Sequence, residues 1–229
     1  MLPGLRVLKR SEVTMTILTM IIKMSEGLGK TCAIFFLTLL FSLPLGMIVA
    51  LLRMSRNKVV STVTRGVISV LRGTPLMLQL LAVTYGPYYL FGISVSRNKL
   101  IPVVIAFAIN YAAYFAEIYR GGIESIPKGQ YEAAEVLGYS KVQTFIRIIL
   151  PQVIKRIVPS VTNEIITLVK DTSIAFTVSY QEIFTIGKQI ANSQTSFLPF
   201  VIAGVFYYVF NAIVDFVMNK VERSLDYYK

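Results

Sequence analysis

The residue types that carry most hydrolytic and metal chemistry are scarce in this chain of 229 residues. It has no histidine, and its one cysteine is Cys32. A cysteine or histidine zinc site, an internal disulfide and a catalytic triad that needs imidazole are therefore excluded. The carboxylates Glu117, Glu164 and Asp215 fall in different apolar segments, without a recognisable catalytic spacing. An enzyme is accordingly the least favoured function class.

One stretch resembles the end of a nucleotide-binding motif, but the rest of the motif is missing. Gly29-Lys30-Thr31 matches the end of the phosphate-binding loop G-x-x-x-x-G-K-[ST], which follows a strand. The first glycine of that motif would fall at Met24, and no strand precedes it. We therefore expect no ATPase site, metal or cofactor in this chain, and any ATP and Mg would be bound by a partner protein.

A second group of polar residues lies within long apolar stretches: Asn163 with Glu164, followed by Lys170-Asp171-Thr172. Such residues are costly in hydrocarbon unless they face protein, water or a ligand. Glu164 could accept the ammonium of an amino acid, and Lys170 could serve an anion. Two other readings remain open: a helix-packing role for Glu164 and a structural Lys170–Asp171 pair at an outer gate.

Arg72-Gly73-Thr74 and Asn110 complete the candidate solute pathway. Pro75 removes a helical hydrogen bond and Gly73 permits close packing, so a helix break that aims backbone groups at a solute is plausible. The alternative is that Arg72 extends to the lipid headgroups, with Pro75 in the first turn of a helix.

The elements that position these residues are membrane spans. Of all residues 55% are hydrophobic and only 15% are charged, with a mean hydropathy of +0.64. A spanning helix needs about 20 mostly apolar residues. Four stretches of this kind are present: 31–52, 73–91, 100–116 and 197–214. A fifth, 148–169, is long enough but carries Lys155, Arg156 and Glu164. We predict an all-α polytopic membrane protein with about five transmembrane helices; an amphipathic surface helix is the alternative for the fifth.

The net charge of +11 would suggest nucleic acid in a soluble protein. In this chain the basic residues are unevenly distributed between the loops. One side of the spans has 14 of them and the other side has 4, or 9 if the amino-terminal stretch is counted. The positive-inside rule then makes the richer side cytoplasmic, the amino terminus external and the carboxyl terminus internal. We expect no nucleic-acid partner. Residues 1–26 are predicted to be an amphipathic segment on the outer surface, 27–225 the permease domain and 226–229 a cytoplasmic tail.

The loop at about residues 120–150 contains residues that favour the starts and ends of short helices. Pro127 suits a first helical turn, with Glu132 near the positive end of the helix. Gly138 suits a left-handed cap, and Ser140 with Gln143 forms a capping box for the next helix. The pattern predicts two short helices joined by a sharp bend, although composition alone would equally describe an ordinary connector.

The spacing of that loop decides between these readings. Glu132-Ala133-Ala134, Gly138 and Ile148-Ile149-Leu150-Pro151 match E-A-A-x3-G-x9-I-x-L-P at every fixed position, which resembles the loop of permease subunits of bacterial ABC importers. The segment beginning Arg72-Gly73-Thr74-Pro75-Leu76, with Gln79, is similar to that of the polar amino acid permeases, as are NYAAYFAEIYRGG from Asn110 and LVKDTS from Leu168. The resemblance covers about residues 27–225.

This resemblance implies the type I ABC importer permease fold in a bacterial plasma (inner) membrane. Glu132, Ala133, Ala134, Gly138 and Pro151 would belong to a coupling helix and its surroundings, docked in a groove of an ABC ATPase dimer. The implied partners are a second permease subunit, identical or paralogous, an extracytoplasmic solute-binding protein (lipid-anchored, fused or periplasmic) and an amino acid. Histidine, glutamate, glutamine, arginine, lysine, cystine and opines remain open as solutes. An ATP-independent carrier or channel is the alternative.

Overall fold

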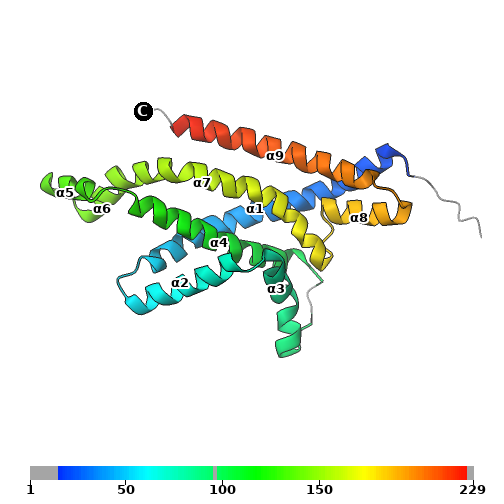
Figure 1. Cartoon of the computed structure of the whole chain (residues 1–229), viewed down its shortest axis with the longest axis horizontal. Coiled ribbons are helices and arrows are strands. Elements are labelled where there is room, and N and C mark those ends of the chain that lie inside the picture. Colours follow the sequence, from blue (N-terminus) through cyan, green and yellow to red (C-terminus); the bar gives the residue numbers. More distant parts are fainter. Residues whose placement is uncertain (1–14, 95–96, 226–229) are drawn as a thin grey trace, which may run out of the picture.

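The computed structural model describes residues 15–94 and 97–225, and every regular element within these ranges is helical. This confirms the predicted all-α class. Four long helices run along the length of the molecule (Figure 1): α1 (Ile17–Arg53), α4 (Leu100–Glu124), α7 (Leu150–Asp171) and α9 (Leu198–Leu225). The structure is thus an elongated bundle whose long axis follows its longest helices.

The helix α4 forms the centre of the bundle and packs most extensively on α1. Its Phe107, Tyr111 and Phe115 are among the largest fully buried side chains. Gly46 of α1 lies so close to α4 that an added Cβ would come within 2.8 Å of the Phe115 Cβ. The absence of a side chain at Gly46 therefore sets the spacing of the α1–α4 pair.

The chain bends at the start of the predicted span 73–91, where Gly73 and Pro75 predicted a helix start or break. The helix α2 (Lys58–Gly73) and the helix α3 (Leu76–Phe91) meet at 106°, and Pro75 is the N-cap of α3. Proline without an N–H suits this first position, where a helical partner is lacking anyway. Gly73 does not serve close packing, since no atom lies within 4 Å of where its Cβ would be.

By length and composition, three described helices are suited to crossing a membrane (α1, α4 and α9), or four if the bent α2–α3 pair is one span. The fifth predicted span corresponds to α7, a helix of 22 residues, which is long enough to cross. The helix α7 is not among these apolar helices, and it contains the charged residues Lys155, Arg156 and Glu164. Its buried face contacts α4 and α9, so it is a bundle helix rather than an isolated surface helix.

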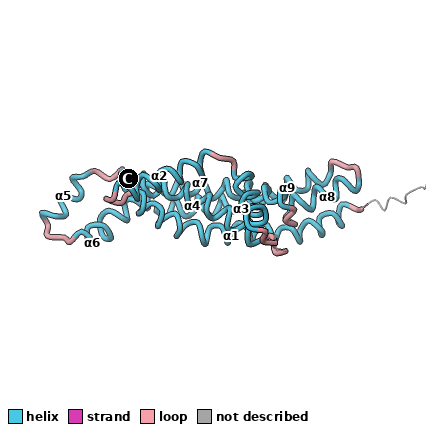
Figure 2. Tube along the Cα trace, turned by 90° about the horizontal axis from the view of Figure 1, so that it is seen from below, coloured by secondary structure: helices cyan, strands magenta, loops and turns pink. Residues whose placement is uncertain are grey.

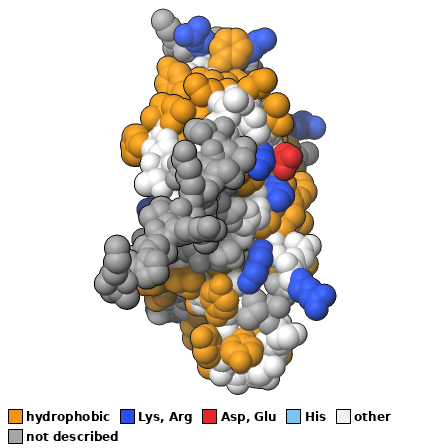
Figure 3. Space-filling view, turned by 90° about the vertical axis from the view of Figure 1, so that its right-hand side faces the viewer, with side chains coloured by type: hydrophobic (Ala, Val, Ile, Leu, Met, Phe, Trp, Pro, Cys, Tyr) orange, Lys and Arg blue, Asp and Glu red, His pale blue; other side chains and the backbone are white. Residues whose placement is uncertain are grey.

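Short helices mark the two ends of the bundle (Figure 2). The α5 end carries α5 (Lys128–Val136), α6 (Lys141–Thr144) and the π-helical turn η1 (Phe145–Ile149). The α8 end carries the 3-10 turn η2 (Thr172–Val178) and α8 (Ile183–Gln194). On the visible face of the α8 end, hydrophobic side chains predominate and charged side chains are scattered (Figure 3).

The predicted amino-terminal surface segment differs from the structure where it can be compared. Residues 1–14 lie outside the described residues, but 17–26 are the first turns of the continuous 37-residue α1. Met20 and Met24 are buried there, in a cluster with Ile183, Ile190 and Ala203. The apolar residues of this stretch therefore pack on α8 and α9 instead of forming a separate helix. The proposed tail, 226–229, also lies outside the described residues.

Candidate functional site

The loop at the α5 end folds as its local sequence predicts. Pro127 is the N-cap of α5, and Gly138 has φ +78°, the left-handed conformation that glycine adopts without strain. The Ser140 side chain accepts from the Gln143 amide at 3.3 Å, and the Ser140 amide donates to Gln143 Oε1 at 2.9 Å. The reciprocal pair fixes the start of α6 directly after the bend.

The residues expected to contact an ATPase do not share one environment. Glu132 and Ala133 are exposed, whereas Ala134 is only 1% exposed and packs within its own chain. Glu132 also lies a full turn inside a helix that begins at Lys128, so the expected interaction with the helix N-terminus is absent. Pro151 is exposed in the first turn of α7. Ala134 therefore lies on the inner side of α5, which contacts α6 and η1, and Glu132 and Ala133 lie on its exposed side.

An apolar surface around the bend was missed by sequence reasoning. Val136 is 88% exposed and Leu137 73% exposed, and Val142 and Ile146 on the following turns are also largely exposed. We call these four residues the coupling patch. Exposed aliphatic residues that cluster in this way mark interaction sites. The signal in the sequence was the pair of adjacent aliphatic residues Val136 and Leu137 at the end of a short, mostly polar helix.

At the bend between α2 and α3, side chains satisfy the backbone that the break leaves open. Gln79 Nε2 donates to the Leu71 carbonyl at 2.8 Å and to the Thr74 carbonyl at 3.1 Å. Asn110, 4% exposed, donates from Nδ2 to the same Leu71 carbonyl at 3.2 Å and to Gln79 Oε1 at 3.0 Å. Both Asn110 amide protons are thereby used to stabilise the break, and the place of this residue in the solute pathway stays a prediction.

Polar residues next to the break form an open face. Arg72, Gly73 and Thr74 are exposed, and the Arg72 guanidinium lies 5.1 Å from the centre of the Tyr114 ring, a cation–π distance. Glu164 on α7 is close enough to Arg72 for their charges to interact. The break therefore brings residues from α2, α4 and α7 together, although they are far apart in the sequence.

One face of α7 continues this polar surface. Asn163, Thr167 and Lys170 are exposed at spacings of four and three residues, as expected for one helical face. Glu164 beside them is half-buried and makes no hydrogen bond or ion pair with a described residue. Within a single chain, Glu164 is thus the carboxylate of this face whose hydrogen-bonding capacity is unused.

The other two predicted pathway residues on this segment have internal partners. Tyr111 of α4 donates its hydroxyl to Asp171 Oδ2 at 2.8 Å. Thr172 is fully buried, and its hydroxyl donates to the Val169 carbonyl at 2.7 Å. Asp171 therefore joins the end of α7 to α4, and Thr172 closes the turn into η2, so both have structural roles in this conformation.

An ion cluster connects α1 and α4 near the α5 end. Arg120 binds Glu117 at 2.7 Å and Glu124 at 2.5 Å, and Arg53 lies 3.9 Å from Glu117. Glu117 and Arg120 lie three residues apart on α4, so that one helical face holds the pair. These residues are thus engaged with one another.

At the α8 end, sequence reasoning missed a buried carboxylate, Glu182. Its side chain is 0% exposed and accepts from the Thr185 amide at 2.6 Å, the Phe184 amide at 2.7 Å and the Tyr207 hydroxyl at 2.6 Å. Burial raises the pKa of this carboxyl, against the opposing effect of the hydrogen bonds. An acidic residue directly before an apolar helix was the available signal, because helix starts need acceptors.

The main chain around Glu182 is pressed onto α1. A Cβ at Gly27 would lie 2.8 Å from the Ile183 nitrogen and 2.9 Å from the Glu182 carbonyl carbon. The Ile183 amide donates to Thr31 Oγ1 at 3.4 Å. We call Gly27, Thr31, Glu182 and Tyr207 the Glu182 clamp, since they join α1, α8 and α9.

Comparisons with known proteins agree with this arrangement. Residues 42–227 match the family model described as the binding-protein-dependent transport system inner membrane component. The chain is 36% identical over 201 residues to the arginine transport system permease protein ArtQ of Bacillus subtilis, covering 87% of this chain and 91% of that protein. It is 34% identical over 208 residues to the L-cystine transport system permease protein TcyB of the same organism, covering 90% and 87% respectively.

Solved structures give the same result. A crystal structure of an amino acid ABC transporter with histidines superposes with a TM-score of 0.83 at 32% identity, covering 92% of this chain and 99% of that one. The MetNI methionine ABC transporter, at 19% identity and a TM-score of 0.70, shares the fold. The chain belongs to the family of binding-protein-dependent transport system inner membrane components, the transmembrane permease subunits of ABC importers.

Proposed function

We propose that this permease imports an amino acid, and that it works as one half of a symmetric or pseudosymmetric pathway. The observation that carries the proposal is the polar face of Arg72, Asn163, Glu164 and Thr167, which lies open beside a broken helix. Polar side chains at membrane depth need a partner. A solute and a second permease subunit, identical or paralogous, provide partners for these side chains.

Within this face, Glu164 binds the ammonium or a basic side chain of the solute, and Arg72 binds its carboxylate. The Arg72 guanidinium can donate two parallel hydrogen bonds to a carboxylate, and Tyr114 limits its movement. Gly73 and Thr74 expose the end of α2 beside it. Lys170 lies further along the same face of α7, where it meets the solute before Glu164 does. Relatives named for arginine, L-cystine and glutamine transport support an amino acid but do not favour one.

At the α5 end, α5 and the coupling patch dock on a cytoplasmic ABC ATPase dimer, which binds ATP and Mg. A rigid helix in a groove transmits ATPase closure to the spans. Gly138 and the capping box hold α5 and α6 at a fixed angle, so that force applied to Glu132 and Ala133 reaches α7 through η1. This assigns the basic side to the cytoplasm, with the amino terminus outside and an extracytoplasmic solute-binding protein at the α8 end.

The proposal is tested by reconstituting the permease with its ATPase and solute-binding protein in proteoliposomes. We expect ATP-dependent uptake of one amino acid, and stimulation of ATP hydrolysis by that amino acid with its binding protein. Proteoliposomes that hold the permease alone are the control. Uptake by the permease alone would support the ATP-independent carrier or channel and contradict the proposal.

A further inference from the structure

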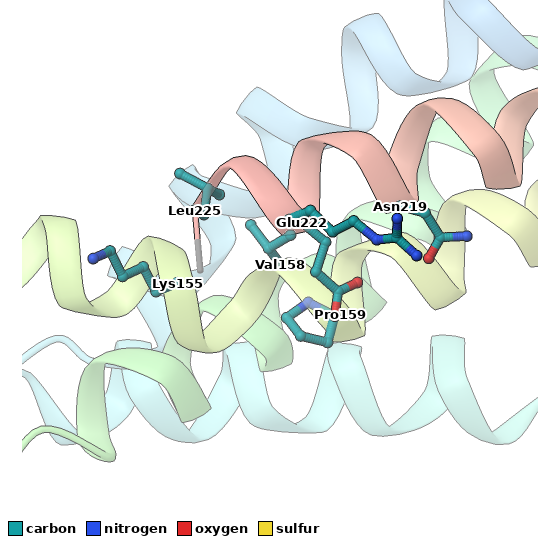
Figure 4. A pocket seen from close by; sticks show the side chains of 7 residues that line it. Lys155, Val158, Pro159, Asn219, Glu222 and Leu225 are labelled. Atoms are coloured by element: carbon teal, nitrogen blue, oxygen red, sulfur yellow. The ribbon is translucent and has the colours of Figure 1, made fainter. Parts of the chain in front are cut away.

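A hollow of about 290 Å³ opens between α7 and α9 near the carboxyl end of α9 (Figure 4). Neither the polar face nor the coupling patch includes it. Its walls combine basic, acidic, amide and aliphatic side chains: Lys155, Val158 and Pro159 from α7, and Asn219, Glu222, Arg223 and Leu225 from α9. The Glu222 side chain reaches across toward Pro159, so the two helices share the floor of the hollow (Figure 4).

The hollow lies about one hydrocarbon-core thickness from the start of α9. The helix α9 begins at Leu198, and a rise of about 1.5 Å per residue puts Asn219 about 32 Å along it. The hydrocarbon core is about 30 Å thick. Ile213 and Val217, six and two residues before Asn219, are exposed aliphatic residues. A polar hollow therefore follows directly on a surface suited to acyl chains.

The charge of this region favours an anion. Two basic residues and one carboxylate line the hollow. A second hollow shares Lys155 and adds Arg147 and Arg156, with no acidic residue among its described lining residues. Arg156 donates a hydrogen bond to the Ser125 carbonyl at 2.6 Å. Among the described residues, basic side chains therefore outnumber carboxylates around the two hollows.

We propose that this hollow binds the headgroup of phosphatidylglycerol from the cytoplasmic leaflet. Lys155, Arg223 and the Asn219 amide donate to the phosphodiester, and Glu222 accepts from a hydroxyl of the terminal glycerol. Basic pockets between transmembrane helices on the cytoplasmic side suit anionic headgroups. The leaflet assignment rests on the proposed function, which makes the α5 end cytoplasmic, but the binding chemistry does not. A bound lipid would tie α7 to α9 below the polar face.

The test is lipid binding to the full chain in detergent, followed by native mass spectrometry during titration with phosphatidylglycerol or phosphatidylcholine. We expect a preference for phosphatidylglycerol. Lys155→Gln with Arg223→Gln should weaken its binding about thirty-fold, from about five-fold for each basic residue lost. The matched control, Arg56→Gln with Lys58→Gln, removes two exposed charges at the same end and should change binding less than twofold.

Equal loss in both double variants would mean nonspecific attraction and would overturn the site. Displacement of the lipid by inorganic phosphate or glycerophosphoglycerol would assign the hollow to a soluble anion and also overturn it. Glu222→Leu should reduce the preference for phosphatidylglycerol over phosphatidic acid, which lacks the glycerol hydroxyls, and an unchanged preference contradicts the role of Glu222. Because binding is measured without transport, failed amino acid uptake would leave this result intact.

Discussion

At the α5 end, Val136 and Leu137 expose most of their aliphatic surface, whereas at the α8 end Glu182 buries a carboxylate completely. Each arrangement inverts the usual preference of apolar groups for the interior and of charged groups for solvent. In the proposed function, the exposed patch is covered by the ATPase. The buried carboxylate already has its partners within the chain. The difference suggests that the α5 end transmits movement from outside the chain, while the Glu182 clamp keeps α1, α8 and the start of α9 together.

The largest effect is expected from Gly138→Pro at the α5 end. Proline requires φ near −65°, whereas Gly138 has φ +78°, so the bend between α5 and α6 cannot form as it does here. A cost of about 3 kcal/mol corresponds to about a hundred-fold loss of the coupled conformation. ATP-dependent uptake should fall accordingly, with the variant still present in the membrane. Gly129→Ala, in α5 with free space around it, is the control, and normal uptake by Gly138→Pro would refute the lever role.

The next largest effect should come from Glu182→Ala in the clamp. It leaves the Phe184 and Thr185 amides and the Tyr207 hydroxyl without their acceptor. Unsatisfied buried groups cost about 1–3 kcal/mol each, partly offset by water entry, so we expect a loss of about 2–4 kcal/mol in unfolding free energy. Thermal unfolding in detergent measures it. The exposed Glu135→Ala serves as control, and an equal change in both variants would argue against the clamp.

A matched glycine pair on α1 tests whether α8 is pressed against it. Gly27→Ala would place a Cβ 2.8 Å from the Ile183 nitrogen, while Gly29→Ala meets nothing within 4 Å. Overpacking against backbone typically costs about 1–3 kcal/mol. Only the first variant should therefore lower the thermal midpoint. If Gly29→Ala proves as harmful, the loss reflects α1 itself and not its contact with α8.

The smallest effect should be seen for Glu164→Gln on the polar face. It removes a charge but keeps an amide of similar shape, so assembly should be preserved while the solute concentration for half-maximal uptake rises about tenfold. Uptake kinetics in proteoliposomes measure this. The exposed Glu26→Gln on α1 controls for a general loss of negative charge. Unchanged affinity and selectivity would remove Glu164 from the solute site.

Sequence reasoning succeeded where the determining contacts are local. Gly138 and the Ser140–Gln143 capping box lie within a few residues of what they control, so spacing alone predicted them. It failed where partners are remote: Asn110 contacts Leu71 and Gln79 across the bundle, and Glu182 meets Tyr207 on another helix.

The same distinction separates the predicted spans from the bend at Gly73. Apolar length predicted α1, α4 and α9, because hydrocarbon thickness sets it. Gly73 and Pro75 predicted a break before α3 but not its angle of 106°, since the stabilising hydrogen bonds come from Gln79 and Asn110. Ala134 shows a related limit, because the loop motif does not indicate which of its residues is buried within the chain.

The most direct test of the contrast between the two ends is site-directed cross-linking in a Cys32→Ser background. Single cysteines would replace Leu137 in the coupling patch and the exposed Asn192 in α8, and each complex would be treated with a cysteine-to-amine cross-linker. We predict that Leu137→Cys cross-links to the ATPase and that Asn192→Cys cross-links to the solute-binding protein. Cross-linking of Asn192→Cys to the ATPase would contradict the assignment of the α5 end as the coupling end.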